Sequence, residues 1–378
     1  MASRTMRLSK SMKCLQVTSL NELSDHRDGW EELRRESGGS VFTSYLLTSL
    51  RLEHYHETVS PNILLVEDHG DISGIAPFAL SRDEIMGFPI ETLTFVGRDN
   101  GRPSYSSLGP LVDLSVDGVI DCLAKGMRSL DWNVLRARDM ESDLGSRHFI
   151  ERMEREFKGK EYVSSIGALC TFSEKEDVSE GFDRKFRREI LSTIRRLELE
   201  NRLKIRSTSS SDEAERAMRV YIRQHIDRWQ SRGGSRFQIL ANAEFIVKMA
   251  VAAQENGIGT VHEVLIDDQV AGQTFVLFDG KVARAYLTGM DDSFAKYRPG
   301  RLTMYFAMAD AHQRGYTVWD FGRGDDDYKM HFGAKPRPLV GVRAERGPLS
   351  GLSKLYHLPP IQRLDEKLRI RQRLFETL

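Results

Sequence analysis

The sequence has few cysteines, no long apolar run and no net charge, and each absence excludes a class of protein. Cys14, Cys122 and Cys170 are far apart and form no Cys-x-x-Cys pair, so we expect neither a disulfide framework nor a cysteine zinc site. No metal is expected. No segment approaches the roughly 18 apolar residues that a membrane helix needs, so we expect no stable membrane insertion. The scarcity of cysteine points to a reducing, cytoplasmic setting.

The charges balance, because the 55 Lys and Arg residues equal the 55 Asp and Glu residues in number. This balance gives no overall attraction to nucleic acid or to a membrane surface, and we expect no DNA partner. The basic segment 1–12 lacks the apolar core of a signal peptide. We interpret it as a flexible N-terminal arm.

The chain of 378 residues suits two domains. Helical spacing over 19–37 and 40–58 precedes an apolar–turn–apolar pattern over 62–83, which predicts a β-hairpin. Strand-like segments, an amphipathic helix over 115–130 and a further strand follow. We therefore predict an α/β or α+β N-terminal domain over 13–170.

The second half repeats this order. A basic helix over 182–204 and two more helices precede three strands joined by tight turns, then a helix from about Gly300 and a strand over 316–322. When the hairpins are superimposed, Gly74 corresponds to Gly272, which favours internal duplication. We predict a second domain over 171–345. An amphipathic tail over 346–378 should pack on the body of the protein or on a second subunit in a homodimer.

The segment around Pro299 and Gly300 has the features of an anion-binding helix start. Proline suits the first helical position, and glycine has no side chain to block close approach. The first amides of a helix lack internal partners and lie at the positive end of its dipole, so they bind phosphate well. Lys296, Arg298 and Arg301 flank this start and would add charge-assisted bonds.

The strands on either side of this helix should be parallel neighbours, because a strand–helix–strand crossover of this length gives that arrangement. Ligands of such units bind beyond the carboxyl ends of the strands. The sequence therefore predicts that Asp291, Asp320, Tyr328 and Lys329 gather at the mouth of one cleft. The alternative for the neighbouring aspartates is a solvated turn, and for Tyr328 a place in the core.

This second half resembles the FemAB-like branch of the GNAT acyltransferases, and in particular the CelD-like acetyltransferases of cellulose and exopolysaccharide biosynthesis. The motifs "GMDDSFAKYRPG" and "VWDFGRGDDDYKMHFG" carry the resemblance, which covers about residues 17–345. The matching positions are Gly289, Asp291, Tyr297, Gly300, Asp320, Phe321, Gly322, Gly324, Tyr328, Lys329, Phe332 and Gly333.

The resemblance implies a fold of two tandem GNAT-like domains and acyl transfer from a thioester, usually acyl-CoA, to a primary amine. The stretch aligned with the family's pyrophosphate loop is "YRPGRL", which departs from the usual pattern at Tyr297 and Leu302. The expected CoA-binding residues are Lys296, Tyr297, Arg298, Gly300, Arg301 and Leu302.

The chemistry of acyl transfer assigns roles to the residues after the strands. Tyr328 would protonate the leaving thiolate, and Asp291, Asp320 or His331 would accept the proton of the amine. Lys329 would hold an anionic group of the substrate.

Three functions remain open from the sequence. The first is acyl-CoA-dependent transfer to an amino sugar, an amino acid or a related small amine. The second is an aminoacyl-tRNA-dependent ligase, for which tRNA would be the partner. The third is a non-catalytic binding module on a GNAT scaffold, because a fold does not determine a function.

Overall fold

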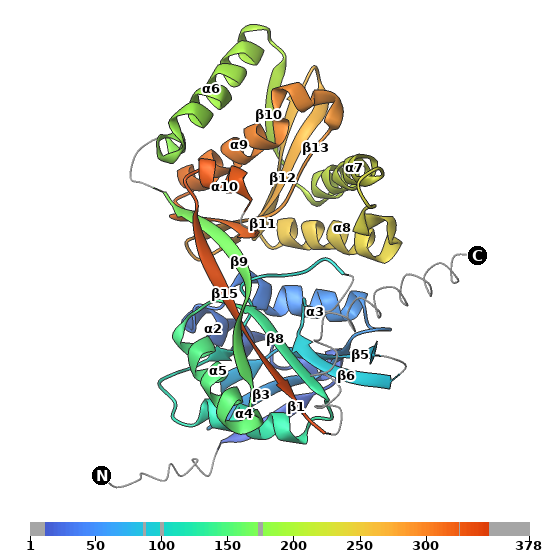
Figure 1. Cartoon of the computed structure of the whole chain (residues 1–378), viewed down its shortest axis with the longest axis vertical. Coiled ribbons are helices and arrows are strands. Elements are labelled where there is room, and N and C mark those ends of the chain that lie inside the picture. Colours follow the sequence, from blue (N-terminus) through green and yellow to red (C-terminus); the bar gives the residue numbers. More distant parts are fainter. Residues whose placement is uncertain (1–11, 86–87, 99–101, 173–176, 325, 348–378) are drawn as a thin grey trace, which may run out of the picture. The chain divides into compact units, whose positions relative to one another are not determined.

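The computed structural model describes residues 12–85, 88–98, 102–172, 177–324 and 326–347 (Figure 1). The predicted arm (1–12) and tail (346–378) therefore lie almost entirely outside the described residues. The chain divides into two compact units, and each includes more than one segment. The N-terminal unit comprises Met1–Asp99, Ser107–Ser164 and Val340–Leu378, and the C-terminal unit comprises Asn100–Ser106 and Ser165–Leu339.

The N-terminal unit has two sets of paired strands. One sheet has the order β1–β3–β4–β7, and β15 begins a second series, β15–β8–β6–β5–β2. Helix α4 packs on β1, β3 and β4, and α2 packs on β4. The elements are β1 (Lys13–Val17), α1 (Leu20–Ser24), α2 (Arg27–Glu36), η1 (Val41–Thr43), α3 (Tyr45–His54), β2 (Ser60–Pro61), β3 (Ile63–Asp68), β4 (Asp71–Ala76), β5 (Phe78–Ile85), β6 (Phe88–Phe95), β7 (Leu111–Val112), α4 (Val119–Ser129), β8 (Val134–Met140) and α5 (Leu144–Phe157).

The C-terminal unit is a six-strand series, β10–β11–β12–β13–β14–β9, with α6 and α9 on one side and α7 and α8 on the other (Figure 1). Strands β9 (Lys160–Thr171) and β15 (Lys335–Glu345) each belong partly to this unit and partly to the N-terminal unit. The other elements are η2 (Val178–Gly181), α6 (Arg184–Leu199), β10 (Leu203–Ser207), α7 (Ser211–Trp229), η3 (Arg236–Gln238), α8 (Leu240–Glu255), β11 (Gly259–Ile266), β12 (Gln269–Asp279), β13 (Val282–Met290), η4 (Asp292–Tyr297), α9 (Pro299–Gln313), β14 (Val318–Arg323) and α10 (Asp327–His331).

The predicted basic helix over 182–204 is too long. Helix α6 ends at Leu199 because Asn201 adopts a left-handed backbone conformation with φ of 52°. The chain then pairs as β10 with β11, from Leu203↔Ile266 to Ser207↔His262. The N-cap of α7 is Ser210, whose side chain accepts a hydrogen bond from the amide of Glu213.

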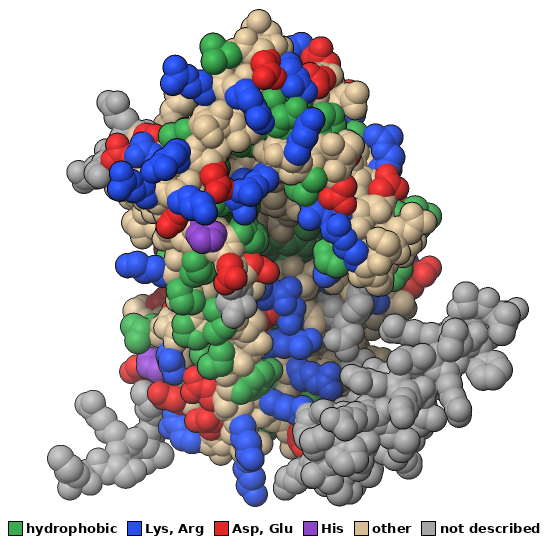
Figure 2. All heavy atoms as spheres, turned by 45° about the horizontal axis from the view of Figure 1, so that its top comes forward, with side chains coloured by type: hydrophobic (Ala, Val, Ile, Leu, Met, Phe, Trp, Pro, Cys, Tyr) green, Lys and Arg blue, Asp and Glu red, His purple; other side chains and the backbone are tan. Residues whose placement is uncertain are grey.

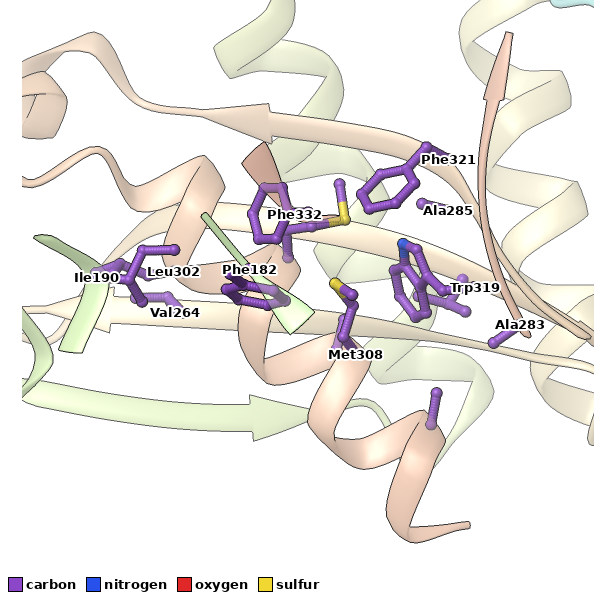
Figure 3. Close-up of a cluster of buried hydrophobic side chains, with 14 of the residues drawn as sticks. Phe182, Ile190, Val264, Ala283, Ala285, Leu302, Met308, Trp319, Phe321 and Phe332 are labelled. Carbon is purple, nitrogen blue, oxygen red and sulfur yellow. The ribbon is translucent and has the colours of Figure 1, made fainter. Parts of the chain in front are cut away.

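One apolar cluster joins α6, α9 and the sheet of the C-terminal unit. Phe186 and Ile190 are buried along one face of α6, at the spacing that its sequence predicts. Leu302 of α9 lies beside Ile190 and Val264, and Phe332 packs edge-on against Phe182 with ring centroids 5.0 Å apart (Figure 3). This core fixes the start of α9 against the sheet.

The two hairpins repeat each other in detail, as the glycine correspondence predicts. Val66 pairs with Gly74 and Val264 pairs with Gly272, and each register shifts directly after these pairs. A Cβ on Gly74 would lie 2.4 Å from Val119, the first residue of α4. A Cβ on Gly272 would lie 2.8 Å from the carbonyl oxygen of Pro299, the first residue of α9. In both units the glycine therefore allows the start of a helix to pack on the hairpin.

A buried histidine on β11 should make stability depend on pH. His262 is 1% exposed, its Nδ1 lies 2.9 Å from Ser207 Oγ, and burial lowers its pKa to about 4. Below pH 6.5 the unfolded chain binds a proton that the folded chain resists, so we expect the free energy of unfolding to fall between about pH 6.5 and pH 4. Urea unfolding at several pH values in this range measures how steeply the free energy of unfolding depends on pH. The His262→Gln variant should show a smaller slope, and an unchanged slope would contradict this prediction.

Candidate active site

A cavity of about 450 Å³ opens at the carboxyl end of β13 in the C-terminal unit. Its walls come from five places in the chain: the last turns of α7, the end of β13, the 3-10 helix η4, the start of α9 and the short helix α10 with Phe332 after it. This volume lies in the range of small-molecule sites. The cavity combines the helix start with one of the two strand ends that the sequence analysis selected, the end of β13.

The cavity exists because β13 and β14 separate. As predicted, the two strands are parallel, and they pair from Val282↔Val318 to Arg284↔Asp320. Beyond these pairs no register pair joins β13 to β14 within the described ranges, although β13 continues to Met290 in register with β12. A register shift next to Ala285 bends β13 at this point. The separation leaves Thr288, Gly289 and Met290 on the cavity wall.

The start of α9 forms the second wall. Arg298 precedes the helix with φ of 53°, no side chain caps the first turn, and Pro299 is the first helical residue. Arg298, Gly300 and Arg301 line the cavity. Arg298 and Arg301 also form ion pairs with Glu189 of α6, at 3.4 Å for Arg301. The uncapped first turn of α9, the positive end of its dipole and two guanidinium groups thus gather at one end of the cavity.

The other three predicted cofactor residues do not line this cavity. Tyr297 lies under the guanidinium groups of Arg196 and Arg202, each 5.4 Å from its ring centre, and the hydrogen bond with Arg202 lowers the pKa of Tyr297. The ammonium group of Lys296 lies 4.9 Å from the same ring. Leu302 is 1% exposed and belongs to the core (Figure 3). For Leu302 the helical turn explains its place in the core, because successive helical residues are rotated by about 100°. Lys296 and Tyr297 precede the helix and belong to η4.

Tyr328 and Lys329 are neighbours with different surroundings. Tyr328 lines the cavity. About a third of its surface is exposed, but burial of the hydroxyl group raises the pKa of Tyr328 to about 12, and Asp326 adds to the rise. The phenol therefore stays protonated at neutral pH and can donate a proton.

Lys329 is 2% exposed and does not line the cavity. Its ammonium group donates hydrogen bonds to the carbonyl oxygens of Arg323 at 2.5 Å and Gly324 at 2.9 Å, and it lies 3.3 Å from Asp326. These contacts hold the turn between β14 and α10. Lys329 thus fixes the segment that carries Tyr328.

The three predicted proton acceptors lie away from the cavity wall. Asp291 caps η4 by accepting hydrogen bonds from the amide and hydroxyl groups of Ser293. Asp320 is 2% exposed and forms ion pairs with Arg284 and Arg337. His331 is exposed and stacks on Phe186 with ring centroids 5.4 Å apart.

Sequence reasoning missed His225, Arg228 and Trp229, which line the cavity from α7. The imidazole of His225 stacks on Trp229 with centroids 5.8 Å apart, and its Nδ1 lies 2.8 Å from Ser235 Oγ. Burial lowers the pKa of His225 to about 4, and Arg236 and Arg228 contribute. The signal was available in their spacing, because residues i, i+3 and i+4 share one helix face.

The family model of the GNAT acetyltransferase domain matches residues 184–330, which include most of the cavity wall. This segment is a GNAT domain. FemX, a solved structure, has a TM-score of 0.62 and 11% identity over 90% of this chain and 99% of FemX. A tandem GNAT protein from the clavulanic acid biosynthesis pathway has a TM-score of 0.51 and 14% identity over 89% of this chain and 99% of its own. No curated protein matches the chain.

A third similar structure is the C-terminal domain of a putative lysylphosphatidylglycerol synthetase from Agrobacterium fabrum, with a TM-score of 0.53 and 9% identity over 88% and 95% of the two chains. Identities this low show the fold alone. They confirm the predicted fold of two tandem GNAT-like domains. The resemblance to the FemAB-like branch stays a prediction, and so does the closer resemblance to the CelD-like group. None of the helices in the described part of the chain is long and apolar enough to cross a membrane.

Proposed function

We propose that the C-terminal GNAT domain transfers an acyl group from acyl-CoA to the primary amine of a small molecule. The cavity carries this proposal, because the start of α9, the separated end of β13 and Tyr328 all border it. Arg298, Arg301 and the uncapped first turn of α9 at Gly300 fit a diphosphate. The edge of β13 fits the extended arm that carries the thioester.

Within this site the protein's groups would act in a simple order. The amine nitrogen forms a bond to the thioester carbonyl carbon, and backbone amides at the end of β13 stabilise the resulting oxyanion. The carbon–sulfur bond then breaks, and Tyr328 gives its proton to the leaving thiolate. One proton leaves the amine, and Tyr328 regains one from solvent, so the products are an amide and a free thiol.

Ligand-dependent stability tests the donor. We expect acetyl-CoA, longer acyl-CoAs or free CoA to raise the unfolding midpoint, because a ligand at a hundredfold its dissociation constant stabilises a protein by about 2.7 kcal/mol. A thermal shift assay with this series measures the effect and its dependence on acyl length. If no member of the series shifts the midpoint, the proposal fails.

Tyr328→Phe tests the leaving-group step. We expect kcat to fall about a hundredfold, because a positioned general acid contributes roughly 10²–10⁴ in rate, while the KM for the acyl-CoA changes little. Release of the CoA thiol measures the rate. Tyr316→Phe is the matched control, because Tyr316 stacks on Phe278 near the other end of α9. Equal activity of both variants would favour a different acid or a non-catalytic binding module.

A second candidate, the aminoacyl-tRNA-dependent ligase, is favoured by the basic surface of α6. Figure 2 shows Lys and Arg side chains spread over one face of the molecule, with Asp and Glu side chains among them. The Lys and Arg side chains exposed on α6 are Arg184, Lys185, Arg188, Arg195 and Arg196. Filter binding of tRNA at increasing salt tests this function, because binding through phosphates weakens steeply with salt.

A further inference from the structure

The cavity wall contributed by α7 carries side chains that can bind a ligand with both a carboxylate and an amine. His225 and Arg228 are three residues apart, so they project from one face of the helix, and Trp229 follows on the same face. The lining within the described residues contains three guanidinium groups and an imidazole but no carboxylate. An ammonium group therefore finds no counter-ion on this wall, whereas a carboxylate does.

Arg228 is available to a ligand at little cost. Its Nε lies 3.6 Å from Asp292, and both side chains are partly exposed, at 30% and 43%. Such an ion pair contributes little to stability. Asp292 also lies 3.4 Å from Arg232, so its charge stays neutralised if Arg228 turns to another partner. A ligand carboxylate could pair with the planar guanidinium through two hydrogen bonds.

His225 is held in place by a serine hydroxyl and by aromatic rings. Ser235 Oγ accepts a hydrogen bond from the amide of Phe237 and lies 2.8 Å from Nδ1 of His225, and Trp229 stacks on the ring. The lowered pKa keeps the imidazole neutral at pH 7. When Nδ1 carries the hydrogen, Nε2 is an acceptor that can take a hydrogen bond from an amine.

We propose that the acyl acceptor is a small amine that also carries a carboxylate, as an amino acid does, with the carboxylate bound by Arg228 and the amine held at His225. This assignment rests on the proposed acyl transfer and selects one of its possible acceptors. As the new nitrogen–carbon bond forms, the amine proton passes to Nε2 of His225 and then to solvent. Tyr328 supplies the separate proton that the thiolate takes up.

The test compares amines that differ only in the acid group. Release of the CoA thiol from acetyl-CoA is measured with phenylalanine, with phenethylamine and with glucosamine, and likewise with other amino acids and their decarboxylated amines. We expect the carboxylate-bearing member of a pair to have at least a tenfold higher kcat/KM. Equal or better use of the decarboxylated amine or of glucosamine would overturn the assignment while leaving acyl transfer intact.

Variants of Arg228 and His225 test which residues cause the preference for amines that carry a carboxylate. Arg228→Met should raise the KM for the amino acid about ten- to hundredfold, without changing the KM for acetyl-CoA or the use of the decarboxylated amine. Arg232→Met is the control, because Arg232 pairs with the same Asp292 but does not line the cavity. Unchanged discrimination in Arg228→Met would contradict the proposed carboxylate contact.

His225→Gln should lower kcat at least tenfold at pH 7, and the rate should recover as the pH rises and more amine is unprotonated in solution. A purely structural role would leave the shape of the pH profile unchanged. Absence of thiol release with every acyl-CoA and amine would contradict acyl transfer itself, and the acceptor assignment would fail with it.

Discussion

Replacing Asp320 by alanine is expected to destabilise the C-terminal unit by about 3–5 kcal/mol, because removing one partner of a buried ion pair leaves the other charge uncompensated. Asp320 is 2% exposed and Arg284 is 7% exposed. One carboxylate oxygen pairs with Arg284 and with Arg337, at 3.3 Å for the latter, and the other accepts a hydrogen bond from the amide of Gly322 at 2.8 Å. The substitution therefore removes the ion pairs with both arginines and the hydrogen bond that holds the end of β14.

Urea unfolding followed by tryptophan fluorescence measures this loss. Asp267→Ala serves as the control, because Asp267 also pairs with an arginine, Arg202, but its side chain is 46% exposed. That variant should unfold much closer to the wild type. Similar losses in the two variants would show that burial does not decide the strength of these pairs. If Asp320→Ala unfolds with the same free energy as the wild type, the ion pair is not needed for stability, and Asp320 would again be a candidate proton acceptor.

The second large effect is expected at the start of α9. Gly300→Glu should reduce affinity for CoA at least a hundredfold, because the side chain enters the cavity and its charge repels a diphosphate. The protein should remain folded, since a glutamate in the first turn of a helix interacts favourably with the helix dipole. Calorimetric titration with CoA measures the affinity, and thermal unfolding without ligand checks the fold.

Gly300→Ala provides the matched control. A Cβ at this position would have Met290 and Thr288 as its nearest neighbours, both at 3.9 Å, which is ordinary contact. This variant should bind CoA much as the wild type does. Retained CoA affinity in Gly300→Glu would mean that the diphosphate binds elsewhere, and the proposed function would lose its main support.

Local sequence patterns were sufficient to predict the fold of the C-terminal unit. Helical spacing located α6 and α9, the tight turns separated β11, β12 and β13, and the crossover rule gave the parallel pair β13 and β14. The boundary of α6 was less accurate, because a left-handed residue at Asn201 is a property of one backbone position. Periodicity does not detect such a position.

The candidate site was harder to predict because side-chain direction depends on tertiary packing. Tyr328 and Lys329 are adjacent in sequence, yet one lines the cavity and the other is bonded to the carbonyl oxygens of a turn. Asp320 matches the family motif, but its partner Arg284 lies 36 residues earlier in the chain. His225 and Arg228 sit on a helix whose polar face resembles an ordinary solvated surface. Only the fold brings that face to the end of β13.

The way β9 and β15 pass from one unit into the other has a practical consequence. The matched GNAT segment, 184–330, omits β9, which pairs with β14 from Val318↔Thr171 to Arg323↔Gly167. It also omits Tyr105, whose buried ring lies 6.4 Å from Phe245 and 6.3 Å from Tyr286. An excised fragment with these limits would present β14 as a bare sheet edge, open to aggregation. Recombinant production of the C-terminal unit should therefore retain the full-length polypeptide.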